Sequence, residues 1–114
     1  MNEKIQKPWG SYQILEKGKN HLVKNIFVKP GGILSLQSHK YRSEHWVVVN
    51  GNATVTIEKK IQYLKSNESV FIPIHKKHRL ANNTKEDLNI IEVQYGNILQ
   101  EDDIIRYKDI YNRK

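Results

Sequence analysis

The sequence predicts an all-β protein, built either as a β-sandwich or as a small barrel. Short segments rich in β-branched and aromatic residues recur along the 114 residues, and Gly, Pro and Asn residues separate them. Many short strands with this punctuation are typical of both architectures. The length suits one domain with a modest hydrophobic core, so we expect a single domain over residues 1–114.

The expected strands follow one another along the chain. The first, 21–28, ends at the Pro-Gly-Gly turn that begins at Pro30. The dipeptide Asn50-Gly51 predicts a tight hairpin, because both central residues of a type I′ turn need positive φ. The segment 101–111 is acidic at its start and mixed later, and suits a short C-terminal helix or an irregular cap. The other expected strands cover 33–41, 44–49, 53–58, 60–64, 69–73, 78–82 and 88–95.

Composition limits the class of partner. The net charge is +7, from 19 Lys and Arg against 12 Asp and Glu, and the basic residues are scattered. Without a basic block we expect no nucleic-acid partner, and the excess charge suits general solubility or a small anionic ligand. No apolar segment has the length of a membrane span or forms a signal peptide, so we expect no membrane partner and a cytoplasmic location. The lack of Cys excludes thiolate metal sites.

Ten residues that begin at Gln37, QSHKYRSEHW, hold an unusual number of groups that bind metals, protons or anions. Side chains in a strand alternate between two faces, so Gln37, His39 and Tyr41 share one face. In the next strand Glu44 lies opposite His45. The face that bears Gln37 and His39 converges with Glu44 if the two strands curve around one pocket. Imidazole nitrogens and a carboxylate oxygen suit divalent transition metals, so the cluster predicts a metal site.

Two patterns in this chain resemble the paired motifs of the cupins. In the first, the glycines after Pro30 precede His39, Glu44 and then, after six intervening residues, Gly51. In the second, Pro73, His78 and Asn82 stand at the family's spacing. The resemblance implies the cupin fold, a double-stranded β-helix or jelly-roll barrel.

The chain departs from the cupin pattern at four places. Asn67 and His75 stand where the second motif has glycines, so both are expected in turns, and Asn tolerates positive φ better than His does. Tyr41 replaces the second histidine of the first motif, and Glu44 comes one or two residues early.

A closer resemblance covers nearly the whole chain. The stretches KPWGSYQIL, KPGGILSLQSHKYRSEHWVVVNGNATVT, ESVFIPIHKKHRLAN, IIEVQYG and EDDIIRYKDIY are similar to the C-terminal domain of bacterial enzymes that combine mannose-1-phosphate guanylyltransferase with type II mannose-6-phosphate isomerase. The guanylyltransferase half has no counterpart here, nor is there a glycine-rich nucleotide loop. The resemblance therefore implies a stand-alone isomerase domain that interconverts mannose 6-phosphate and fructose 6-phosphate.

The resemblance also implies a ligand set for a divalent metal. His39, Glu44 and His78 are the expected ligands and Gln37 is the fourth candidate, since type I phosphomannose isomerases bind zinc through a Gln-x-His pair, a Glu and a distant His. Zinc is the first choice, with Fe, Mn, Co or Ni as alternatives. Tyr41 either ligates weakly or donates its hydroxyl to a ligand or to the substrate.

The proton-transfer group and the phosphate contact stay open. The base is Glu44, His45 or a metal-bound water, and Glu44 cannot easily be both ligand and free base. Arg42 is the first candidate for a phosphate clamp, and Arg106 the next. The other cations considered, whose alternative is a solvated basic rim, are Lys76, Lys77 and Arg79.

Two other functions remain possible. One is a non-catalytic sugar-binding or regulatory cupin, favoured by the Tyr41 replacement. The other is a different cupin reaction on a sugar nucleotide or small metabolite, since one fold hosts many functions. The apolar face that bears Val47 and Val49 needs covering, so we also expect a homodimer.

Overall fold

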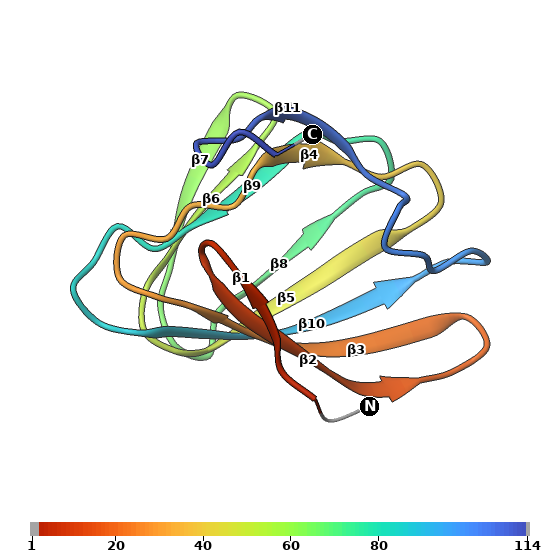
Figure 1. Ribbon diagram of the computed structural model, residues 1–114, viewed down its shortest axis with the longest axis horizontal. Coiled ribbons are helices and arrows are strands. Elements are labelled where there is room, and N and C mark those ends of the chain that lie inside the picture. Colours follow the sequence, from red (N-terminus) through yellow and green to blue (C-terminus); the bar gives the residue numbers. More distant parts are fainter. Residues whose placement is uncertain (1–2, 114) are drawn as a thin grey trace.

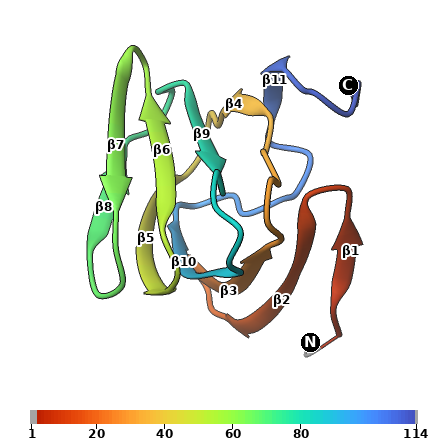
Figure 2. The ribbon, with the colours of Figure 1, turned by 90° about the vertical axis from the view of Figure 1, so that its left-hand side faces the viewer.

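The computed structural model describes residues 3–113 and contains two antiparallel sheets that face each other. Figure 1 shows the sheets one above the other, and Figure 2 shows the N-terminal hairpin at the opposite side of the barrel from β7 and β8. The six-stranded sheet, in spatial order, contains β1 (Ile5–Lys7), β2 (Gly10–Lys17), β3 (His21–Val28), β10 (Leu88–Tyr95), β5 (Ser43–Asn50) and β8 (Ser69–Ile72). The five-stranded sheet contains β11 (Ile105–Lys108), β4 (Leu36–Ser38), β9 (His78–Ala81), β6 (Ala53–Ile57) and β7 (Lys60–Leu64).

Alternation along the strands builds the core between the sheets. Val48, Val55, Leu88 and Ile90 are completely buried, and they come from β5, β6 and β10. Complete burial of such a side chain contributes about 1.5–3 kcal/mol to folding. No helix in the described part of the chain is long and apolar enough to cross a membrane.

The turn at Asn50-Gly51 is not the predicted hairpin, because β5 lies in the six-stranded sheet and β6 in the five-stranded one, so the turn carries the chain between sheets. Of its two central residues only Gly51 has a positive φ, of 94°. Asn67 and His75, which replace the glycines of the second cupin motif, have φ of 75° and 70°. The chain thus keeps the backbone shape that the motif requires at both positions, with the strain of a side chain in the left-handed region.

Two expected elements are wrong or incomplete. The strand expected over 33–41 is reduced to β4 and an isolated bridge between Ile33 and Ala81. Strand β4 stops before residue 40, because the Asp103 carboxylate, rather than a neighbouring strand, accepts the backbone N–H groups of Lys40 and Tyr41. The short C-terminal helix is also wrong: residues 105–108 form β11, which pairs with β4 and covers an open sheet edge.

Candidate metal centre

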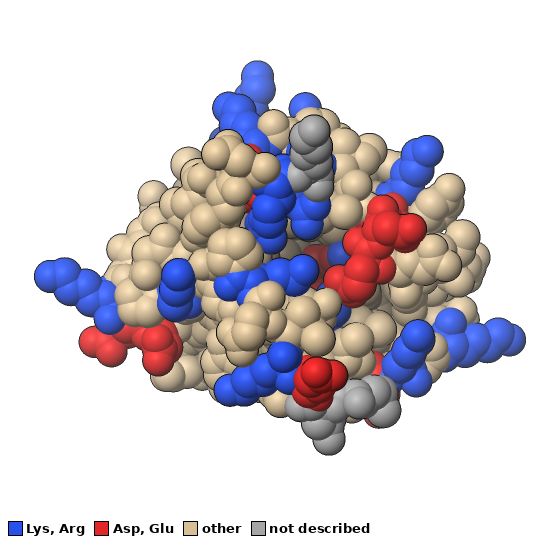
Figure 3. Space-filling model, viewed as in Figure 1, with Lys and Arg blue, Asp and Glu red and all other residues tan. Residues whose placement is uncertain are grey.

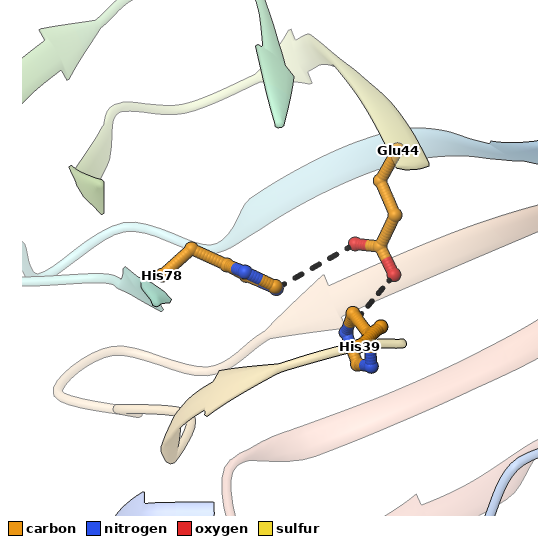
Figure 4. Close-up of side chains that lie close together, drawn as sticks. All are labelled: His39, Glu44 and His78. Atoms are coloured by element: carbon orange, nitrogen blue, oxygen red, sulfur yellow. Dashed lines mark ion pairs between the residues drawn. The ribbon is translucent and has the colours of Figure 1, made fainter. Parts of the chain in front are cut away.

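Three buried side chains converge inside the barrel from three different segments. His39 follows β4, Glu44 lies on the inward face of β5, and His78 is the first residue of β9. Each is at most 3% exposed, and their candidate ligand atoms all lie within 4.8 Å of one another. Figure 4 shows both imidazole rings approaching the Glu44 carboxylate. The structure thus brings the three predicted ligands together.

Backbone carbonyls hold both imidazole rings. His39 donates its Nδ1–H to the carbonyl oxygen of Asp103 at 2.7 Å, and His78 donates its Nδ1–H to that of Lys76 at 2.9 Å. These bonds leave Nε2 of each ring as an electron-pair donor. The buried Nε2 of His78 has no hydrogen-bond partner among residues 3–113. A buried lone pair without a partner is costly, and a bound cation would satisfy it.

The Glu44 carboxylate faces both Nε2 atoms. Its Oε2 lies 3.2 Å from Nε2 of His39, and its Oε1 lies 3.9 Å from Nε2 of His78. Burial alone would raise the pKa of Glu44, but the charges of Arg42 and His78 and a hydrogen bond from Glu92 lower it below its usual value. Burial, followed by the charge of Arg42, lowers the pKa of His39 to about 4. The His39–Glu44 contact at neutral pH is therefore not an ion pair, because a neutral imidazole faces a carboxylate.

This donor set fits a divalent cation. Two neutral imidazole nitrogens and one carboxylate oxygen are the ligands of many zinc and iron sites, which keep further positions open for water or substrate. Gln37 lies directly opposite His78 in the β4–β9 pair and lines the same cavity, so the two side chains share a face. Its amide nitrogen donates to Oγ of Ser35 at 3.0 Å, which leaves its oxygen as the atom for a metal.

Asp103 holds the loop between β4 and β5, and no pattern in the sequence singled this residue out. Its carboxylate oxygens accept the backbone N–H groups of Lys40 at 2.9 Å and Tyr41 at 3.0 Å, while its carbonyl accepts from His39. The segment before β11 thus fixes a ligand that comes from a loop without strand pairing of its own.

Arg42 lies beside the candidate metal ligands, where it is only 6% exposed. Its Nε donates to Oε2 of Glu44 at 2.8 Å, and its Nη2 lies 3.3 Å from Nε2 of His39. A third guanidinium nitrogen donates to the carbonyl of Gln100 at 3.2 Å. The guanidinium is therefore committed to the ligand set, a position that does not favour the phosphate clamp expected of it.

Four other predicted site residues lie away from the cluster. His45 points to the outer face of the six-stranded sheet, where its ring centroid lies 4.7 Å from that of Phe71. Tyr41 is 48% exposed, so its side chain does not reach the ligand set. Lys76 and Lys77 are exposed on the turn before β9. Strand alternation explains the place of His45, and the early end of β4 explains that of Tyr41.

Arg79 and Arg106 do line the cavity between the sheets, which has a volume of about 150 Å³. Arg79 was expected to point away from His78, yet it borders the same cavity. Its guanidinium donates to the carbonyls of Leu34 at 2.9 Å and Lys108 at 3.0 Å. Those bonds join the loop before β4 to β11.

The structure adds one buried acid that the sequence reading missed. Glu92 lies on the inward face of β10, lines the cavity and is 5% exposed. It accepts hydrogen bonds at 3.0 Å from Nε1 of Trp46, which also donates to Glu44, and from Nε2 of Gln94. Burial, then the charge of Glu44, raises the pKa of Glu92 to about 7. The signal in the sequence was strand alternation, because Glu92 lies on the same face of β10 as two buried apolar residues, Leu88 and Ile90.

Comparisons with known proteins identify the family of this chain. Residues 1–109 match the family model described as mannose-6-phosphate isomerase C-terminal. The chain is 51% identical over 109 residues to the alginate biosynthesis protein AlgA of Pseudomonas fluorescens, covering 96% of the chain and 23% of the relative. It is 46% identical over 113 residues to the mannose-1-phosphate guanylyltransferase ManC of Salmonella typhimurium, covering 99% of the chain and 24% of the relative. The chain thus spans under a quarter of the length of these relatives.

Solved structures show the same fold at low sequence identity. A conserved protein with a double-stranded β-helix domain from Klebsiella pneumoniae has a TM-score of 0.75 at 15% identity, over 94% of this chain and 86% of that one. An RmlC-like cupin from Shewanella frigidimarina has a TM-score of 0.77 at 22% identity, over 89% and 87%. The chain therefore belongs to the family of mannose-6-phosphate isomerase C-terminal domains, and it has the cupin double-stranded β-helix fold.

Proposed function

We propose that this domain is a metal-dependent isomerase that interconverts mannose 6-phosphate and fructose 6-phosphate. The observation that carries the proposal is the cluster of His39, Glu44 and His78 in a family member, with Glu44 and His78 lining the cavity between the sheets. Zinc is the preferred metal, with Fe, Mn, Co or Ni as alternatives, and Gln37 would supply a fourth ligand. When bound, the metal would polarise the sugar oxygens next to the reacting carbons.

The protein's own groups would bind the sugar and move the proton. An aldose–ketose isomerase removes the proton from C2 of the aldose, holds the enediolate, and returns a proton to C1. Glu92 is a carboxyl group that lines the cavity without belonging to the ligand set. We assign the proton transfer to Glu92, with Trp46 and Gln94 holding its carboxyl group through hydrogen bonds.

The test is a coupled isomerase assay on metal-stripped protein, followed by addition of each divalent metal in turn. Turnover of mannose 6-phosphate that depends on the added metal would support the proposal. Binding of the sugar phosphate without turnover under every metal would instead identify a sugar-binding cupin, the second function expected from the sequence.

We further propose that the domain forms a homodimer through the outer face of β5 and β8. Val47, Val49 and Phe71 are 38%, 49% and 49% exposed on this face, and Phe71 lies opposite His45, two residues before Val47. Exposed apolar patches of this kind mark association surfaces. Light scattering should show twice the 13.4 kDa chain mass, and a 13.4 kDa species alone at high micromolar concentration would contradict the dimer. The cytoplasmic location, and the expectation of no nucleic-acid or membrane partner, stand as predictions beside this proposal.

A further inference from the structure

Arg106 belongs to a row of residues that crosses the five-stranded sheet to the metal centre. In the register of the sheet, Arg106 of β11 pairs with Gln37 of β4, which in turn pairs with His78 of β9. Residues directly opposite one another in antiparallel strands point to the same face. All three line the cavity between the sheets. The guanidinium of Arg106 is therefore carried on the same inner wall as two of the candidate metal ligands.

The length of this row suits a sugar phosphate. Neighbouring strands lie about 4.8 Å apart, so the backbone of Arg106 stands roughly 10 Å from that of His78. In a hexose 6-phosphate the carbons that isomerise lie at one end of the chain and the phosphate lies at the other. Two anchors for such a molecule must therefore be separated by most of its length, which a metal centre at His78 and a cation on β11 provide.

The charges around the cavity favour an anion. Six cationic side chains line it against three carboxylates. Figure 3 shows blue side chains along one border of the central hollow and a red group along another. Cavities of one dominant charge attract ligands of the opposite charge.

We propose that Arg106 binds the phosphate group of a phosphorylated sugar whose reacting carbons lie at the His39–Glu44–His78 cluster. A guanidinium suits this task because it can hold two phosphate oxygens at once. This inference rests on the proposed isomerase function for the choice of substrate. It moves the phosphate contact away from Arg42, which is bound to the ligand set.

The experiment compares Arg106→Gln with Lys108→Gln by calorimetric titration with mannose 6-phosphate, unphosphorylated mannose and inorganic phosphate. Lys108 is a matched control, since it removes one positive charge from the same strand but is exposed and lies outside the cavity lining. Arg106→Gln should weaken binding of mannose 6-phosphate about 10- to 100-fold, as expected for loss of a charge-assisted contact. Binding of mannose and the metal content should stay unchanged. Arg106→Lys, which keeps the charge but loses the fork, should fall between wild type and Arg106→Gln.

The outcomes separate this inference from the isomerase proposal. If Arg106→Gln binds mannose 6-phosphate as wild type does, or loses mannose and its phosphate equally, the phosphate site is wrong even in an active isomerase. If the wild type binds the sugar phosphate and inorganic phosphate through Arg106 but turns nothing over, the phosphate site stands and the isomerase proposal fails.

Discussion

The two inner walls of the barrel carry opposite chemistry. The wall from β5 and β10 presents the carboxyl groups of Glu44 and Glu92, joined through Trp46 Nε1. The wall from β9, β4 and β11 presents His78, Gln37 and Arg106. The acidic wall supplies negative charge and a group able to hold a proton, while the other supplies an imidazole, an amide and a cation. The candidate metal ligands lie where the walls meet, so one ion would bridge both sheets.

Loss of His78 should break the bridge between the walls most severely. His78→Ala removes one of three ligands, so metal affinity should fall by more than the roughly 10- to 100-fold typical of residues that only support a ligand. Metal analysis after dialysis provides the measurement. His21→Ala is the control, because His21 lies at the start of β3 and pairs with Glu16 on the surface. Equal metal content in the two variants would rule out the ligand assignment.

The raised pKa of Glu92 should destabilise the metal-free protein as pH rises, against an opposite contribution from His39, whose pKa is lowered to about 4. Because burial raises the pKa of Glu92 to about 7 from an ordinary 4.5, the folded protein keeps a proton that the unfolded chain has lost between these values. The proton held by folded Glu92 stabilises the folded state in full below pH 4.5. This stabilisation is lost as pH rises through 7, which lowers the free energy of unfolding by at most about 3 kcal/mol.

Glu92→Gln removes this titration and keeps the shape of the side chain. Urea unfolding at pH 5 and pH 8, with a chelator present, should show that the change in stability from pH 5 to pH 8 is more favourable in Glu92→Gln than in wild type. Equal changes in the two proteins would show that Glu92 makes no such contribution.

Asp103 tests how the loop between the walls is held. Asp103→Ala removes the acceptors of two backbone N–H groups next to His39, so metal affinity should fall about 10- to 100-fold. Asp102→Ala is the matched control, since Asp102 is the exposed neighbour in the same turn. Equal affinities, measured by competition with a metal-binding dye, would mean that the loop holds His39 without this carboxylate.

His45 should give the smallest effect, because its side chain lies on the outside of β5 while Glu44 lies inside. His45→Ala should leave metal content unchanged and alter the isomerase rate by less than about twofold. Its free energy of unfolding should stay within the roughly ±0.5 kcal/mol usual for surface positions. A large drop in rate at unchanged metal content would return His45 to the role of proton carrier that the sequence left open.

Alternation and motif spacing in the sequence determine much of this protein without reference to its tertiary structure. Period-two patterns placed β3, β5 and β10 and put Glu44 and His45 on opposite faces, because strand geometry is local. The motif spacing identified His39, Glu44 and His78, and predicted turns at Asn67 and His75, where φ is positive. These features depend on a few consecutive residues, so the sequence contains them directly.

Only the tertiary structure decided which distant groups act on the site. Asp103 reaches His39 across 64 positions, and β11 brings Arg106 beside Gln37. Glu92 becomes a raised-pKa acid only because folding buries it next to Glu44. Sheet pairing and burial set these relations, and both depend on how the whole chain closes rather than on local pattern. The same reason explains why Arg42, adjacent in sequence to the ligands, is bound to Glu44 instead of facing the far end of the cavity.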